Sequence, residues 1–122
     1  MIKNGLLRLS LLSIVTIVIG KNTGCEPYLD VEDKFKCGSE GYPMTYGYKN
    51  CMNFVKEENY NRFTDSGKKF IDCTVKCLGS AITNISRVTS NCDDLKTEAF
   101  ESHVDCYLQY LFYQHLGTVP NL

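Results

Sequence analysis

Seven cysteines are the residues of this chain with the most evident chemistry. They are Cys25, Cys37, Cys51, Cys73, Cys77, Cys92 and Cys106. These cysteines could form disulfide bonds, as is usual in exported proteins, or they could bind zinc. Zinc sites usually contain closely spaced pairs such as Cys-x2-Cys. The closest pair, Cys73 and Cys77, is four residues apart, so the spacing favours disulfides over a metal site. Because seven is odd, three bridges would leave one thiol, either buried and inert or joining two chains.

The N-terminus predicts that these cysteines reach an oxidising compartment. Lys3 and Arg8 flank a short apolar stretch, Leu9 to Ile19, which ends in small residues and is typical of a signal peptide. A membrane anchor is the alternative, but the uninterrupted apolar core is about half of the ~20 residues that a bilayer crossing needs. We therefore expect residues 1–20 to be a cleaved signal peptide and residues 21–122 to be one cysteine-rich secreted domain.

Charge excludes one class of partner. The 102 residues after the predicted cleavage site carry 11 basic and 14 acidic side chains, a net charge of −3. The lysines are interleaved with acids, whereas a nucleic-acid-binding protein needs a concentrated basic face. We expect no nucleic acid partner, no cofactor and no membrane contact after removal of the signal peptide.

The side chains that could serve an enzyme do not converge. His103 and His115 are the only histidines, and twelve residues along one predicted helix place them about three turns apart. The adjacent acids Asp93 and Asp94 point in different directions from a helix. We therefore predict no catalytic residue and no metal ligand, and we expect that the protein is not an enzyme.

Apolar residues at steps of three and four predict the helices that must position the cysteines. The clearest helix follows the candidate N-terminal caps Thr64 to Ser66, and places Cys73 and Cys77 on one flank. Its apolar stripe is Ile71, Val75, Leu78, Ile82 and Ile85.

A second long helix is predicted from Ser90 or Asn91 until Gly117 and Pro120 stop it. Acids in its first turn would interact favourably with the helix dipole. Its expected core stripe is Leu95, Ala99, Val104, Tyr107 or Leu108, and Leu111.

The remaining chain gives a weaker pattern. One amphipathic helix is predicted from about Tyr48 to Phe63, whereas glycines and prolines from Lys21 to about Tyr46 predict only short regular structure. No alternating run argues for a sheet. The predicted fold class is all-α: a small disulfide-stabilised helical domain of about three helices after a signal peptide.

Two surface features are predicted beside the cysteines. Asn84 begins the only Asn-x-Ser/Thr sequon after residue 20, and it is a candidate glycosylation site. Apolar residues also surround most of the last helix, which indicates either burial between other helices or a contact face for a partner. The candidate partner face is Tyr107, Tyr110, Leu111, Phe112 and Tyr113.

The stretch Phe63-Thr-Asp-Ser-Gly67-Lys68-Lys-Phe70-Ile-Asp-Cys73-Thr-Val75-Lys76-Cys77 resembles the most recognisable segment of the stanniocalcins. That segment reads Phe-Asp-x-x-Gly-Lys-x-Phe and continues to an apolar-Lys-Cys ending. Cys92 and Cys106-Tyr107 stand close to the next two cysteines of the family, and Cys51 with Phe54 resembles the start of the preceding helix. The resemblance covers about Cys51 to Tyr107.

This resemblance implies the bridges Cys77 to Cys106, Cys37 to Cys92 and Cys25 to Cys51, with Cys73 free or joining two chains. Stanniocalcins are secreted, disulfide-linked dimeric glycoproteins that act as hormones in calcium and phosphate balance, and some inhibit pappalysin metalloproteases. The implied function is a hormone-like ligand of an extracellular receptor or other protein partner, with a homodimer as one expected assembly.

Other functions stay open. The chain ends before the family's C-terminal half, and the family normally has no cysteine at the position of Cys73. The cysteine spacing from Cys73 to Cys106 is also similar to nematode secreted domains of unknown function. A carrier or an enzyme would instead act through a pocket, which requires a lined cavity or converging polar groups, and neither is evident in the sequence.

Overall fold

A computed structural model describes residues 22–116, and no strand is present in that range. Its elements are α2 (Glu26–Phe35), the π-helix η1 (Pro43–Tyr48), α3 (Lys49–Val55), α4 (Glu57–Tyr60), α5 (Asp65–Val88) and α6 (Cys92–Leu116). The predicted all-α, disulfide-stabilised fold class is confirmed. The predicted signal peptide and the stop at Gly117 and Pro120 lie outside the described residues.

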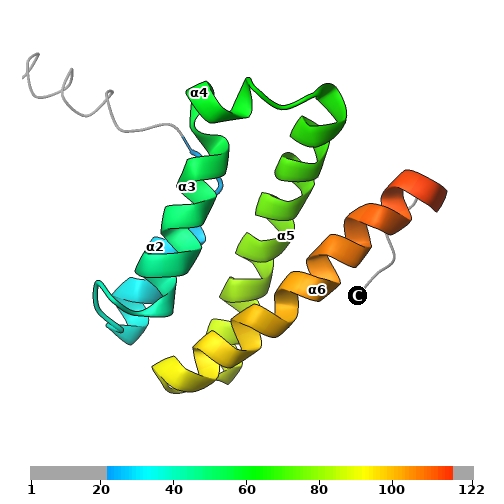
Figure 1. The fold of residues 1–122 in the computed structure, drawn as a ribbon. Helices are drawn as coiled ribbons and strands as arrows, with labels where there is room; N and C mark the ends of the chain where they lie inside the picture. Colours follow the sequence, from blue (N-terminus) through cyan, green and yellow to red (C-terminus); the bar gives the residue numbers. More distant parts are fainter. Residues whose placement is uncertain (1–21, 117–122) are drawn as a thin grey trace, which may run out of the picture.

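Helix α5 is the centre of the arrangement. It packs against α6 on one side and against α2 and α3 on the other (Figure 1). The Lys34 ammonium group donates to the Ser86 carbonyl oxygen, which ties α2 to the end of α5. Buried side chains from these helices and from the residues just before them form the core. They are Cys25, Tyr28, Val31, Tyr42, Cys51, Ile82, Leu95 and Ala99.

The two long helices follow their predicted patterns. The Thr64 hydroxyl accepts a hydrogen bond from the Gly67 amide (3.1 Å), so Thr64 is the N-terminal cap of α5. The Asn91 side-chain oxygen accepts from the Asp94 amide (2.8 Å) at the start of α6. Ile82 is buried on the predicted stripe of α5. Local capping chemistry therefore places both helix starts within two residues of their predicted positions.

The helix predicted from about Tyr48 to Phe63 is not continuous. It is divided among the last residue of η1, α3 and α4, and the break falls at Lys56, whose backbone is extended (ψ 131°). Tyr60 on α4 donates through its hydroxyl to the Asp72 carboxylate (2.9 Å) on α5. The polar run after Val55 has no apolar face to bury, so the helix ends there and restarts. The expectation of about three helices was therefore too low.

Helix α2 contradicts the prediction of only short regular structure before Tyr46. Pro27 lies in its first turn, where a proline costs no hydrogen bond. The Glu26 carboxylate accepts from the Thr23 amide (2.7 Å) and the Gly24 amide (2.8 Å), and these bonds lower the pKa of Glu26. Tyr28 is buried against the core. The glycines that suggested irregular structure stand outside α2, so they delimit the helix instead of interrupting it.

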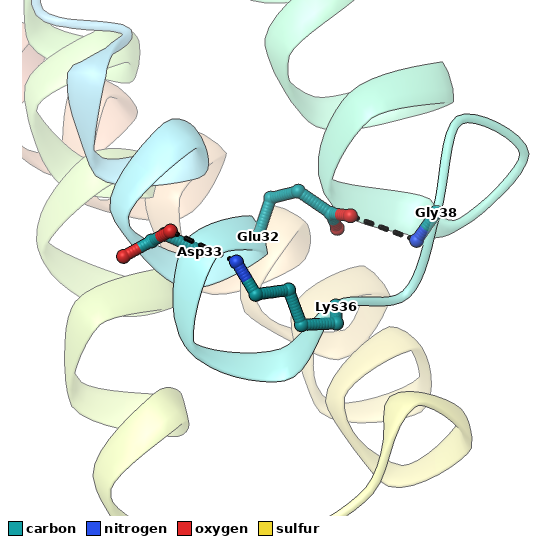
Figure 2. A network of polar contacts seen from close by, with 4 residues as sticks. All are labelled: Glu32, Asp33, Lys36 and Gly38. Atoms are coloured by element: carbon teal, nitrogen blue, oxygen red, sulfur yellow. Dashed lines mark hydrogen bonds and ion pairs between the residues drawn. The ribbon is translucent and has the colours of Figure 1, made fainter.

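Polar contacts hold the turn that follows α2 (Figure 2). Lys36 has a left-handed backbone (φ 54°), and its ammonium group pairs with the Asp33 carboxylate at 3.0 Å. The Glu32 carboxylate accepts from the amide of Gly38 (2.8 Å), whose φ of 90° favours glycine. This turn presents Cys37, which is bonded to the first residue of α6.

Three disulfides join the helices within the described residues. They are Cys25–Cys51 between the start of α2 and α3, Cys37–Cys92 between the loop after α2 and α6, and Cys77–Cys106 between α5 and α6. These are the pairs that the family resemblance implies. Cys73 is free and half-buried.

The π-helix η1 brings aromatic side chains against α6. It packs closely on α2 at Gly47: a Cβ added there would lie 2.4 Å from the Tyr28 ring, which is too close for any side chain. Glycine is therefore required at this contact. The close approach positions Tyr42 and Tyr46 beside α6.

Candidate functional site

An apolar groove of about 420 Å³ lies over α5, between η1 and α3 on one side and α6 on the other. Its floor is formed by α5, and its walls are mainly aromatic. The floor residues are Phe70, Ile71, Thr74, Val75 and Leu78, and the main wall residues are Tyr42, Tyr46, Phe54, His103 and Tyr107. The volume falls within the range of small-molecule sites.

Aromatic contacts hold one wall of the groove to the other. The Tyr42 and Phe100 rings meet edge to face with centroids 5.2 Å apart, and the Tyr46 and His103 rings stack at 5.8 Å. The Tyr42 hydroxyl and the His103 Nε2 are 3.1 Å apart and hydrogen-bonded. Contacts of this geometry add stability beyond the burial of apolar area, so they help fix the wall positions.

The groove is electrically neutral. No Lys, Arg, Asp or Glu is among its lining residues. Burial lowers the pKa of His103, raises the pKa of Tyr28 to about 12 and raises that of Tyr42 further, so each favours its uncharged form. The buried hydroxyl of Thr74 on α5 has no hydrogen-bond partner within the described residues.

The low pKa of His103 predicts a pH-dependent stability. Below its ordinary pKa of 6.5, the unfolded chain binds a proton that burial resists in the folded chain, so stability falls as pH decreases from about 6.5. His103→Gln, which has no titratable ring, should reduce this pH dependence. Urea unfolding of both proteins at pH 7 and pH 5 measures the effect, and an unchanged difference between the two pH values would contradict it.

The outer face of α6 is the second candidate site. Val104, Leu108 and Leu111 recur at four- and three-residue steps and therefore share one side of the helix. Their exposed fractions are 59%, 46% and 47%. The prediction that Val104, Tyr107 or Leu108, and Leu111 belong to the core stripe was wrong, because all four are exposed, whereas Leu95 and Ala99 are buried as expected.

The predicted partner face is only partly exposed. Tyr107, Leu111 and Phe112 are exposed. The prediction was wrong for Tyr110. Its ring centroid lies 5.0 Å from that of Phe70, and its hydroxyl donates to the Ser66 carbonyl oxygen (3.1 Å). It is therefore buried between α6 and α5. The side chain of the fifth predicted residue, Tyr113, lies outside the described part of the structure, as does that of His115.

A line of acids borders the outer face of α6. Glu98, Glu101 and Asp105 are exposed and recur at steps of three and four, so they occupy one neighbouring strip of the helix. The outer face is therefore apolar along its middle and negative along one edge.

The remaining predicted sites lie elsewhere on α5. Asn84 is exposed, and its side-chain oxygen accepts from Arg87 (3.2 Å). The groove itself was not predicted, because its residues come from five separate helices between positions 28 and 107. The tyrosines at 42 and 46, one helical turn apart, were a local signal for an aromatic wall.

No family model, curated protein or solved structure matches this chain.

Proposed function

We propose that this chain is a secreted, non-catalytic protein ligand that acts by binding an extracellular protein through the outer face of α6. The observation that carries the proposal is the row of exposed apolar side chains Val104, Leu108 and Leu111. The row is about 10 Å long. Contiguous apolar surface of this kind is characteristic of contact sites.

Disulfides support the extracellular location. Three bridges join the helices of the described domain, and such bonds persist in oxidising compartments. The signal-peptide pattern of residues 1–20 agrees with this location. The exposed position of Asn84 supports its use as a glycosylation site in the secretory pathway.

The partner's chemistry follows from the outer face of α6. An apolar strip bordered by Glu98, Glu101 and Asp105 complements an apolar patch bordered by basic residues. An antiparallel pair of identical α6 helices would instead bring two acidic borders together. A different protein is therefore favoured over a second copy of this chain.

The resemblance to stanniocalcins supports a hormone-like role for this ligand. It suggests regulation of calcium and phosphate balance or inhibition of a metalloprotease of the pappalysin type. Both activities require protein-protein contact and no catalytic group, in agreement with the proposed use of α6.

A cell-binding assay tests the proposal. The labelled protein, recovered from the medium of expressing cells, should bind saturably to cells of the source organism, and Val104→Glu should weaken binding by about tenfold or more, because it places a charge within the apolar strip. Val88→Glu is the matched control, since Val88 is 84% exposed at the end of α5 and away from that strip. Circular dichroism verifies that both variants fold.

Three outcomes would contradict the proposal. They are retention of the protein inside the cell, equal binding by the Val104→Glu and Val88→Glu variants, and a dimer in solution that Val104→Glu dissociates. Inhibition of a pappalysin by the wild type but not by Val104→Glu would support the protease-inhibitor form of the proposal.

A further inference from the structure

We infer that the glycan carried by Asn84 lies in a polar cleft between α2 and α5, where its inner sugars become part of the surface of the folded domain. The cleft has a volume of about 820 Å³, and none of the described residues of α6 lines it. The inference rests on the secretion of the chain and the glycosylation of Asn84 that are proposed above. It adds the place where the glycan lies and the side chains that it contacts.

The attachment site is itself a wall residue of the cleft. Asn84 is exposed, and it lines the cleft near one end of the α5 wall, which extends from Asp72 to Arg87. A helix rises 1.5 Å per residue, so this wall is about 22 Å long. Side chains of a helix lean toward its N-terminus, so Asn84 leans toward Ser80, one turn earlier in the same wall.

A hydrogen bond orients the carboxamide of Asn84. Its Oδ1 accepts from Nη1 of Arg87 (3.2 Å), which follows Asn84 on α5. The nitrogen Nδ2, which carries the sugar of an N-linked glycan, is the other branch of the same planar group. Because Oδ1 is directed to Arg87, Nδ2 is directed away from Arg87 and toward the part of the wall that precedes Asn84. The first sugar therefore begins in the cleft and not beyond the end of α5.

The lining of the cleft suits a carbohydrate. Asp30 on α2 and Lys76 and Ser80 on α5 are exposed along it, and they offer a carboxylate, an ammonium group and a hydroxyl. Sugar hydroxyls both donate and accept hydrogen bonds, as serine hydroxyls do, so they can pair with all three groups. Half-buried Pro27 and Val75 add apolar surface, against which the C–H faces of sugar rings can pack.

Close packing fixes the two walls of the cleft. Helix α2 approaches α5 at Gly79, where an added Cβ would lie 3.3 Å from Cγ of Pro27. Further along both helices, the Lys34 ammonium group donates to the Ser86 carbonyl oxygen. A site with fixed walls binds without the entropic cost of ordering them.

Covalent attachment decides what occupies the cleft. A tethered group has an effective concentration of roughly millimolar order beside the site to which it is linked, so weak contacts are enough to hold it. A free sugar or the glycan of another protein lacks this advantage. The glycan of Asn84 is therefore the expected occupant.

Lysine acylation measures where the glycan lies. Lys76 lines the cleft, about 12 Å along α5 from Asn84. Secreted wild-type protein and Asn84→Gln are treated with sulfosuccinimidyl acetate at pH 7, and peptide mass spectrometry follows each lysine. We expect Lys76 to react about fivefold more slowly in the glycosylated protein, because one net hydrogen bond favours the seated glycan by about that factor. Lys69, which is exposed on α5 outside the cleft, should react equally in both proteins.

Further variants separate contact from bulk, each compared with its own version that lacks the Asn84 glycan. Asp30→Ala removes a glycan contact but keeps the glycan, so it should lower the protection of Lys76. Asp33→Ala makes the same change on α2 outside the cleft and should not. A glycan moved to α6 by Lys96→Asn with Glu98→Thr, in the Asn84→Gln background, should leave Lys76 unprotected.

The inference is overturned if the secreted protein carries no glycan, if Lys76 reacts equally in the wild type and Asn84→Gln, or if Asp30→Ala and Asp33→Ala protect Lys76 equally. Cell binding through α6 is a separate result, because α2 and α6 pack on different sides of α5 (Figure 1). Asn84→Gln should leave that binding unchanged, and Val104→Glu should leave the protection of Lys76 unchanged. The two proposals can therefore fail separately.

Discussion

Replacing both Cys37 and Cys92 with alanine is expected to lower the free energy of unfolding by about 4 kcal/mol. The two residues are 55 positions apart, the largest separation of the three bridges in the described domain. Loss of a bridge over a longer loop releases more conformational freedom in the unfolded chain. Domains of this kind have a total stability of roughly 5–15 kcal/mol, so the expected loss is a large part of it.

The measurement is urea unfolding in a Cys73→Ala background, which prevents exchange between the free thiol and the remaining disulfides. Both Cys37 and Cys92 are half-buried, so their truncation leaves little cavity and the effect reports the cross-link. Cys73→Ala by itself is the control and should change stability by less than about 1 kcal/mol. A loss below about 1 kcal/mol for the double variant would show that this bridge does not constrain the unfolded chain.

Leu95→Ala should be the most damaging single substitution of those considered, with a loss of about 3 kcal/mol. Leu95 is 0% exposed in the first turns of α6, where it belongs to the core shared with Ile82 and Ala99. Its truncation removes buried apolar contacts and leaves a cavity that the disulfide-linked helices cannot easily close. Urea unfolding monitored by circular dichroism provides the measurement.

Leu108→Ala is the matched control for Leu95→Ala, because it makes the same chemical change on the same helix at a side chain that is 46% exposed. Its expected cost is below about 1 kcal/mol. Equal losses for the two variants would mean that α6 is packed in a different rotation, with the groove wall and the outer face placed differently from this structure.

One wall of the groove and the outer face are both formed by residues of α6. His103 and Tyr107 line the groove, whereas Val104 and Leu108, one position further along the helix in each case, face outward. A helix turns by about 100° per residue, so neighbouring residues can serve different surfaces. This explains why apolar side chains occur on more than one side of α6.

The sequence by itself determined the parts of the protein that depend on local chemistry. The segment Thr64 to Ser66 and the pair Ser90 and Asn91 marked the starts of α5 and α6, because a side-chain oxygen that caps a helix acts within a few residues, and Thr64 and Asn91 supply the caps. The apolar spacing from Ile71 to Ile85 predicted α5, because one face of it is buried along its length. The cysteine spacing favoured disulfides over metal binding, and bridges are present in the described domain.

Only the tertiary structure decided which side of α6 is covered. Tyr107 and Tyr110 are both aromatic and lie in the same turn, yet Tyr110 is 6% exposed and Tyr107 is 42% exposed. A helix with apolar residues all round carries no periodic signal that identifies its buried face. The Cys77–Cys106 bridge and the contact with Phe70 set that rotation, and both join residues far apart in the chain.

The groove likewise exists only in the folded chain. Its lining extends from Tyr28 to Tyr107, and its width depends on how η1, α3 and α6 are held over α5. Helix α2, which supports η1 through the contact of Tyr28 with Gly47, was itself obscured by the glycines and prolines around it. Local patterns specify elements, whereas a cavity is the space left between elements, so its position follows from long-range packing and cross-links.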